Sequence, residues 1–98
     1  MIGDRPVFID IDGTLTDQGT QGGNPLSERI EKVRHMIAQG VAVVIWSGTG
    51  TVYARDFADR HGLAVLAAIG KPEYLVDDNP HIRPPGKMVV KSPEAFFA

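Results

Sequence analysis

The chain has 98 residues, 43% of them apolar, and no cysteine, so a single domain must be stabilised by packing, without disulfides or a cysteine-based zinc site. Its formal net charge of −2 is spread along the sequence, and no basic run predicts a nucleic-acid-binding surface. No apolar run approaches the ~20 residues of a membrane helix, and the N-terminus lacks the pattern of a signal peptide. We therefore expect one domain over residues 1–98 that is cytoplasmic and makes no membrane contact.

The first half of the chain predicts a strand, a helix and a second strand. Val7, Phe8 and Ile9, followed by Ile11, are apolar without alternation, which is typical of a strand buried on both faces. Asn24-Pro25 is a typical helix start, with Asn as the cap and Pro at the first helical position. A second buried strand is expected over residues 41–46. The helix between them ends at Gly40 and has one apolar stripe, formed by Leu26, Ile30, Val33 and Ile37.

The second half predicts one more helix and up to three further strands. Residues 51–61 form the helix, which Gly62 ends and whose expected core contacts are Val52, Tyr53 and Phe57. The strand candidates are residues 63–69, 74–76 and 88–90, and the Pro/Gly-rich stretch 83–87 is expected to be a loop. This alternation predicts an α/β fold: a Rossmann-like, mostly parallel layered sheet with helices on both faces and right-handed crossovers.

One connection does not fit a fully parallel sheet. A parallel crossover needs about a dozen residues or more, whereas only a few residues separate the run ending at Ile69 from the run starting at Tyr74. Either one of these two strands is antiparallel or irregular, or the first is not a full strand.

Polar residues follow the apolar runs at the points where ligands bind in parallel sheets, beyond the carboxyl ends of the strands. They are Asp10 and Asp12 in FIDIDGT, Ser47 in VIWSG, Lys71 in IGKP, and Asp77-Asp78 in YLVDD. Two carboxylates this close in a buried run repel each other unless something compensates their charge.

This set of residues suits phosphoryl transfer. A carboxylate attacks phosphorus only when the mutual negative charge is neutralised, for which Mg²⁺ with oxygen ligands is well suited. Ser47 and Lys71 can donate to the phosphoryl oxygens, and Gly13 lets the backbone approach the phosphate. A second carboxyl two residues after the nucleophile can give a proton to the leaving oxygen.

Taken in order, these residues resemble the haloacid dehalogenase superfamily, in its phosphatase branch, over residues 5 to about 80. Asp10-Ile11-Asp12-Gly13-Thr14 matches the D-x-D-G-T motif in full, and Ser47-Gly48, Lys71 and Asp77-Asp78 match the three later motifs. The resemblance implies that Asp10 is the nucleophile and a metal ligand, and that Asp12 is the acid/base and binds metal through its backbone carbonyl.

The resemblance further implies that Ser47, Gly48, Lys71 and Gly13 bind the substrate phosphate. Of the acidic pair, Asp77, directly after Val76, is the favoured direct metal ligand and Asp78 a ligand through water, and the sequence leaves the reverse assignment open. The chain departs from the superfamily in having no room for a long helix between Lys71 and Asp77 and no cap domain. It resembles the small, capless kind, for which we expect either a homodimer that covers the open site or an open monomer.

Each motif also has a purely structural interpretation. Ser47 can cap the second helix, Lys71 can be a solvated loop charge, and Asp77 to Pro80 can form a turn. The Gly/Gln-rich stretch 18–23 is either a flap over the site or an unstructured connection. Three scattered histidines have no metal-binding spacing, and we expect them to be structural or solvated: His35, His61 and His81.

We expect a Mg²⁺-dependent phosphatase that acts through an aspartyl-phosphate on Asp10. A phospho-accepting receiver module is a second interpretation, but its phosphorylated Asp lies on a middle strand, where this chain has Trp46-Ser47. A non-catalytic binding module that retains the fold is a third. The sequence leaves the substrate open, and nucleic acid is expected only as a phosphorylated substrate.

Overall fold

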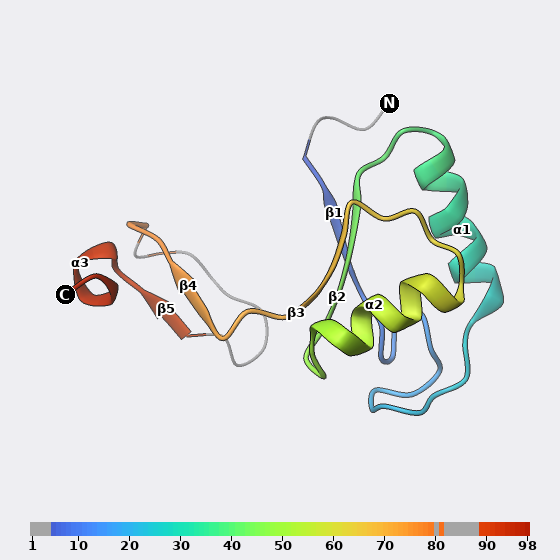
Figure 1. Cartoon of the computed structure of the whole chain (residues 1–98), viewed down its shortest axis with the longest axis horizontal. Coiled ribbons are helices and arrows are strands. Elements are labelled where there is room, and N and C mark those ends of the chain that lie inside the picture. The colour runs from blue at the N-terminus through green and yellow to red at the C-terminus, as the bar shows by residue number, and fades with distance from the viewer. Residues whose placement is uncertain (1–4, 80, 82–88) are drawn as a thin grey trace.

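The computed structural model of the chain describes residues 5–79, 81 and 89–98 (Figure 1). Met88 and the predicted loop 83–87 lie outside the described residues. The elements, in chain order, are β1 (Val7–Asp10), α1 (Ser27–Ala38), β2 (Val43–Ser47), α2 (Thr51–Arg60), β3 (Ala67–Gly70), β4 (Tyr74–Val76), β5 (Val89–Lys91) and α3 (Pro93–Phe96).

The three strands β1, β2 and β3 form one parallel sheet in that order. Ile9 lies opposite Ile45, and Ile45 lies opposite Ala68, so these apolar residues share one face of the sheet. Helices alternate with the strands along the chain. The predicted α/β fold with Rossmann-like layering of a parallel sheet is confirmed.

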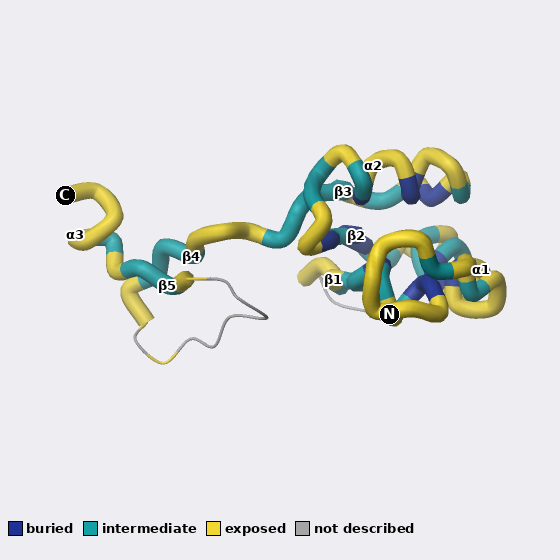
Figure 2. The backbone as a smooth tube through the Cα atoms, turned by 90° about the horizontal axis from the view of Figure 1, so that it is seen from below, coloured by how far each residue is buried: buried dark blue, intermediate teal, exposed yellow. Residues whose placement is uncertain are grey.

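Both α1 and α2 pack on the same face of this sheet. Ile30 and Val33 of α1, together with Phe57 of α2, join a buried cluster that contains Val43 and Ile45 of β2. In Figures 1 and 2 the two helices accordingly lie to one side of the three strands. We expected helices on both faces, but right-handed crossovers that step in one direction along a sheet place their helices on the same side.

The opposite face of the sheet is less covered. Phe8 and Trp46 contact each other edge to face, with 4.8 Å between ring centroids, and Phe8 is 46% exposed.

Val52 of α2, which we placed in the core, is 82% exposed. The inward side of α2 is formed by Ala54, Phe57 and Ala58, and at 100° per residue Val52 points roughly the opposite way from Ala54.

The start of α1 differs from the prediction. Leu26 caps the helix with an extended backbone, and Ser27 is its first residue. Asn24 instead bonds to Asp17, which accepts its backbone N–H at 2.7 Å and its side-chain amide at 3.3 Å. Pro25 pairs with Thr16 in an antiparallel bridge. These tertiary hydrogen bonds outweigh the local preference of Asn-Pro for a helix start.

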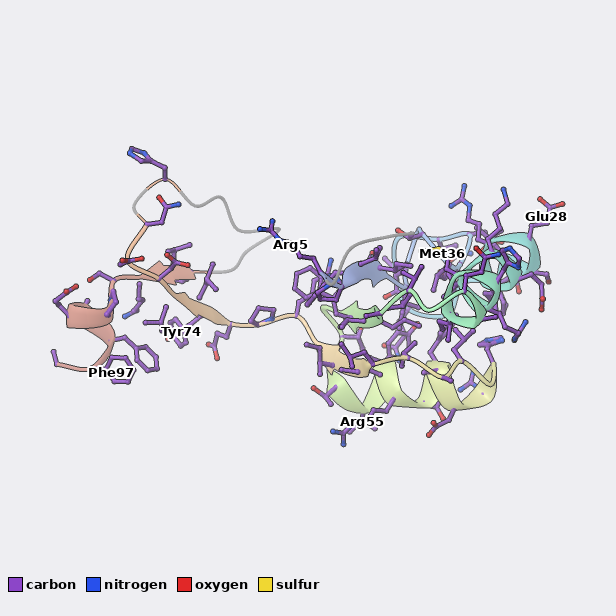
Figure 3. All side chains as sticks on the ribbon, turned by 90° about the horizontal axis from the view of Figure 1, so that it is seen from above. Arg5, Glu28, Met36, Arg55, Tyr74 and Phe97 are labelled. Atoms are coloured by element: carbon purple, nitrogen blue, oxygen red, sulfur yellow. The ribbon has the colours of Figure 1, made fainter. Side chains whose placement is uncertain are left out.

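The second sheet resolves the short connection after β3. β4 leaves the main sheet and pairs in parallel with β5, and α3 follows with Ser92 as its cap. In Figure 1 this two-stranded sheet lies apart from the three-stranded one. Figure 3 shows the labelled Tyr74 and Phe97 in this outlying part of the chain. Within the described part of the chain, no helix has the length and apolar character needed to cross a membrane.

Candidate functional site

The turn after β1 presents the two aspartates of the first motif at the end of the sheet. Ile11 is fully buried, and its carbonyl oxygen accepts the backbone N–H groups of Thr14, Leu15 and Thr16 at 2.8 to 3.1 Å. Gly13 has a φ of 77°, a left-handed value that glycine adopts without strain. The chain therefore turns sharply around one anchored carbonyl, which leaves Asp10 and Asp12 on either side of a buried residue.

Asp10 pairs with a cation that arrives from β3. The Nζ of Lys71 lies 3.2 Å from Oδ1 of Asp10, and each side chain is about one-third exposed, at 31% and 32%. The backbone N–H of Lys71 donates to the carbonyl of Ser47 at 2.8 Å, which fixes the lysine beside β2. Its ammonium also lies 5.7 Å from the centre of the Trp46 ring. The structure thus brings Asp10 and Lys71 together, as predicted from their positions at strand ends.

Asp12 is held by hydroxyl groups. The phenol of Tyr53, in the first turns of α2, donates to Oδ1 of Asp12 at 2.7 Å, and Oγ1 of Thr49 lies 3.5 Å from Oδ2. Burial raises the pKa of Tyr53 to about 12, and the hydrogen bond to Asp12 and the charge of that carboxylate act in the same direction. The phenol is consequently a firm proton donor to Asp12 at neutral pH.

Tyr53 and Thr49 were not among the predicted site residues. Tyr53 belongs to an apolar stretch of α2, and we assigned it only to the core. One signal could have found it: α2 begins just beyond the end of β2, so its first turns must lie at the edge of the sheet where Asp12 also lies.

The segment between β1 and α1 is a flap next to these residues. Its two ends are joined by the Thr16–Pro25 bridge and by a hydrogen bond from Leu26 N–H to the carbonyl of Leu15 at 2.8 Å. Residues 17–22 are exposed along their whole length (Figure 2). Of our two interpretations of residues 18–23, the flap is therefore the one that the structure supports.

A cavity of about 410 Å³ lies between the flap and the strand ends. The segments at the ends of β1, β2 and β3 and the flap contribute to it, so residues of the first three predicted motifs meet there. Its lining consists of Asp10, Asp12, Gly19, Thr20, Gln21, Gly48, Thr49 and Lys71.

Two predicted phosphate-binding residues lie differently from what we expected. Ser47 is 1% exposed, and its Oγ accepts the backbone N–H of Thr49 at 3.1 Å, so it organises the turn before α2 rather than lining the cavity. The N–H of Gly13 donates to Oγ1 of Thr16 at 3.2 Å. Gly48 does line the cavity.

Asp77 and Asp78 are not brought to this cavity. Both follow β4 in the second sheet, where Oδ1 of Asp77 accepts the backbone N–H of Asn79 at 2.7 Å and the Asp77 N–H donates to the carbonyl of Lys91. Among the residues that the structure describes, no three or more Asp, Glu or His side chains form a metal-binding group. The predicted cluster of four aspartates is absent there, because β4 pairs with β5 in a separate sheet.

The three histidines lie outside the cavity. His35 and His81 are exposed, whereas His61 follows α2 and its ring packs against Phe57 with centroids 4.4 Å apart. Burial lowers the pKa of His61, and the nearby charges of Arg60 and Arg34 lower it further.

Comparison with known proteins adds no further constraint: no protein-family model matches the chain, and no curated protein or solved structure matches it. The residues and their geometry carry the functional argument alone.

Proposed function

We propose that this chain is a phosphate monoester hydrolase in which Asp10 forms a covalent aspartyl-phosphate and Asp12 transfers the protons. The observation that carries the proposal is the cavity in which Asp10, Asp12 and Lys71 meet, with the Lys71 ammonium 3.2 Å from the Asp10 carboxylate. A nucleophile, a second carboxyl and a cation within one open cavity are the groups that hydrolysis of a phosphate ester requires.

In the first step, an Asp10 oxygen forms a bond to phosphorus while the bond to the leaving oxygen breaks. Lys71 stabilises the charge on the phosphoryl oxygens, because its Nζ already lies beside the attacking carboxylate. Asp12, protonated, gives its proton to the leaving oxygen so that an alcohol departs rather than an alkoxide.

In the second step, the Asp12 carboxylate removes a proton from water, which attacks phosphorus and releases Asp10 and inorganic phosphate. Tyr53 is a positioning residue in both steps. Its phenol holds Asp12 at 2.7 Å, and a phenol can hydrogen-bond to either protonation state of a carboxyl group.

The donor set at Asp10 and Asp12 fits Mg²⁺ in part. Mg²⁺ takes oxygen ligands and often binds through only one or two carboxylates, with water and substrate phosphate completing its shell. Lys71 contacts one of the two oxygens of Asp10, and the other oxygen and the Asp12 carbonyl would hold the ion. The metal would neutralise charge between Asp10 and the phosphate. Roles for Asp77 and Asp78 as further ligands stay a prediction from the resemblance.

The test uses an aryl phosphate as substrate, with and without Mg²⁺, followed by trapping of the intermediate. We expect hydrolysis by the wild-type chain that chelation abolishes, and none by the Asp10→Asn variant. With acetyl phosphate, whose leaving group needs little proton assistance, the Asp12→Asn variant should accumulate a phosphoryl group that hydroxylamine removes.

Two results would contradict the proposal. Phosphoryl mass on the Asp10→Asn variant would place the nucleophile elsewhere. Hydrolysis that strong chelators leave unchanged would exclude the metal. Circular dichroism of both variants serves as the control for folding.

A further inference from the structure

A second cavity, of about 330 Å³, lies on the other side of the flap tip from the candidate active site. The flap forms one wall and α2 forms the other, so the space belongs to neither element alone. Residues that line it are Thr16, Gln21, Gly22, Gly23, Pro25, Tyr53, Asp56, Phe57, Arg60 and His61.

The two cavities meet at Gln21 and at the contact between Tyr53 and Asp12. Gln21 lines both of them. Tyr53 lines the second cavity while its phenol donates to Asp12, which lines the first. Only the Tyr53 side chain therefore stands between the second cavity and the carboxyl group that, in the proposed function, protonates the leaving oxygen.

A phosphate ester bound with its phosphoryl group next to Asp10 has to direct its alcohol portion past Asp12, because the leaving oxygen must reach that proton donor. The space directly behind Asp12 is bounded by Tyr53 and the flap. We infer that the second cavity is the subsite for the alcohol portion of the substrate, and that it takes a single hydroxylated ring of the size of a sugar. This inference rests on the proposed function.

The lining has the two kinds of surface that a sugar ring requires. Tyr53, Phe57 and Pro25 provide apolar surface on which the C–H face of a ring can pack. Asp56 and Arg60, one turn apart on α2, form an ion pair and offer acceptors and donors for hydroxyl groups. A ring of six atoms with its hydroxyls fits a space of this volume.

Gly23 lets the flap fold closely on itself where it lines the second cavity. A Cβ at this position would lie 2.9 Å from the backbone nitrogen of Gln18, closer than atoms tolerate. A side chain at position 23 would therefore disturb the fold of the flap.

The experiment follows backbone amide signals of the ¹⁵N-labelled Asp10→Asn variant, which cannot turn the ligand over, during titration with three probes in the presence of Mg²⁺. Inorganic phosphate and ethyl phosphate should move the signals of Gly48 and Thr49 only. Glucose 1-phosphate should move these signals and, in addition, those of Gly22, Asp56 and Arg60.

A matched pair of substitutions then measures the subsite. Arg60→Ala should weaken glucose 1-phosphate about fivefold, which corresponds to the loss of one solvent-exposed hydrogen bond, and should leave the affinity for inorganic phosphate unchanged. Arg55→Ala is the control, because Arg55 lies on the same helix and points away from the sheet (Figure 3). It should change neither affinity.

Each outcome separates the two ideas. If glucose 1-phosphate moves only Gly48 and Thr49, the ring does not enter the second cavity; the subsite is refuted while phosphate binding stands. Equal effects of Arg60→Ala and Arg55→Ala would refute the subsite as well. If no probe moves Gly48 or Thr49, phosphate does not bind at the first cavity, and the proposed function and the subsite both fail.

Discussion

The hydrogen bond between Tyr53 and Asp12 can be tested without knowing the substrate, because it should contribute measurably to folding stability. At 2.7 Å from a carboxylate oxygen, the phenol makes a charge-assisted hydrogen bond, a class that contributes about 1.5–3 kcal/mol to stability. The rise in the pKa of Tyr53 from 10.0 to about 12 corresponds to an upper bound of roughly 2.7 kcal/mol. Burial is the largest cause of that rise, so only part of it belongs to the pair.

Asp12 is half-buried, and water can replace a lost donor there. We therefore expect a coupling energy of about 1 kcal/mol between Tyr53 and Asp12, below the range for fully buried charged hydrogen bonds. For a domain of this size, a destabilisation of about 1 kcal/mol lowers the melting temperature by roughly 4–8 °C.

The assay is a double-mutant cycle of Tyr53→Phe and Asp12→Ala, with urea or thermal unfolding of the wild type, both single variants and the double variant. The cycle isolates the pair from the packing of the Tyr53 ring, which Phe retains. Tyr74→Phe combined with Asp12→Ala is the control, because Tyr74 lies on β4 in the second sheet. Additivity of the Tyr53 cycle within about 0.3 kcal/mol would refute the hydrogen bond and the positioning role that we derive from it.

Three further predictions concern charge. In an alkaline absorbance titration, the wild-type chain should show one phenol that ionises with a pKa of about 12, and this signal should be missing from Tyr53→Phe. Because the pKa of Tyr53 is raised in the folded state, the stability that Tyr53 contributes should be lost between about pH 10 and 12. A signal near pH 12 that survives Tyr53→Phe would contradict the assignment. Because the pKa of His61 is lowered in the folded state, the stability that His61 contributes is present above its unfolded-state pKa of 6.5 and is lost as the pH falls below that value. Between pH 7 and 5, the melting temperature of His61→Phe should therefore fall less than that of the wild type. Parallel falls in the two melting temperatures would contradict the lowered pKa. Lys71→Gln should lower the affinity for inorganic phosphate about tenfold, but it should cost less than about 1 kcal/mol of stability because the Asp10–Lys71 pair is one-third exposed. The control Lys32→Gln, on the solvent side of α1, should change neither quantity. Calorimetry measures the affinity and thermal unfolding the stability, and an unchanged phosphate affinity in Lys71→Gln would remove Lys71 from the site.

The sequence predicts that Asp10 and Lys71 lie close together, and the parallel sheet accounts for this placement. Asp10 ends β1 and Lys71 follows β3, and both strands flank β2, so their carboxyl ends are close for any chain that folds into this topology. Apolar runs determine the strands, and strand direction determines where the polar residues meet. The order and direction of the strands alone therefore bring these residues together.

The parts that the sequence does not predict depend on hydrogen bonds between distant segments. Asn24 has a strong local preference for a helix cap, yet its partner is Asp17, seven residues away on the other side of the flap. The aromatic ring of Tyr53 is typical of a core residue, and nothing in the sequence shows that its hydroxyl has a partner. Only the position of α2 beyond β2 brings that hydroxyl to Asp12. Neither partner can be identified from spacing or periodicity.

The acidic motif shows a further limit. Val76 and Asp77 have the pattern of a strand followed by a metal ligand, but the pattern does not say which strand is the neighbour. The connection from Gly70 to Tyr74 is too short for a helical crossover, and β4 pairs with β5. Because β4 leaves the three-stranded sheet, Asp77 and Asp78 after it lie away from the ends of β1, β2 and β3, although their sequence matches the acidic motif.

The two aspartates of the first motif differ in their surroundings in a way that matches their proposed roles. The partner of Asp10 is an ammonium group, which lies where it can also stabilise charge on a phosphoryl group that Asp10 attacks. The nearest partners of Asp12 are the hydroxyls of Tyr53 and Thr49, which are neutral. A hydroxyl donates to a carboxylate and accepts from a carboxylic acid, so these partners can stay in place while Asp12 gains and loses its proton. The environment of each carboxyl, rather than its residue type, is therefore what distinguishes the nucleophile of the proposed mechanism from its acid and base.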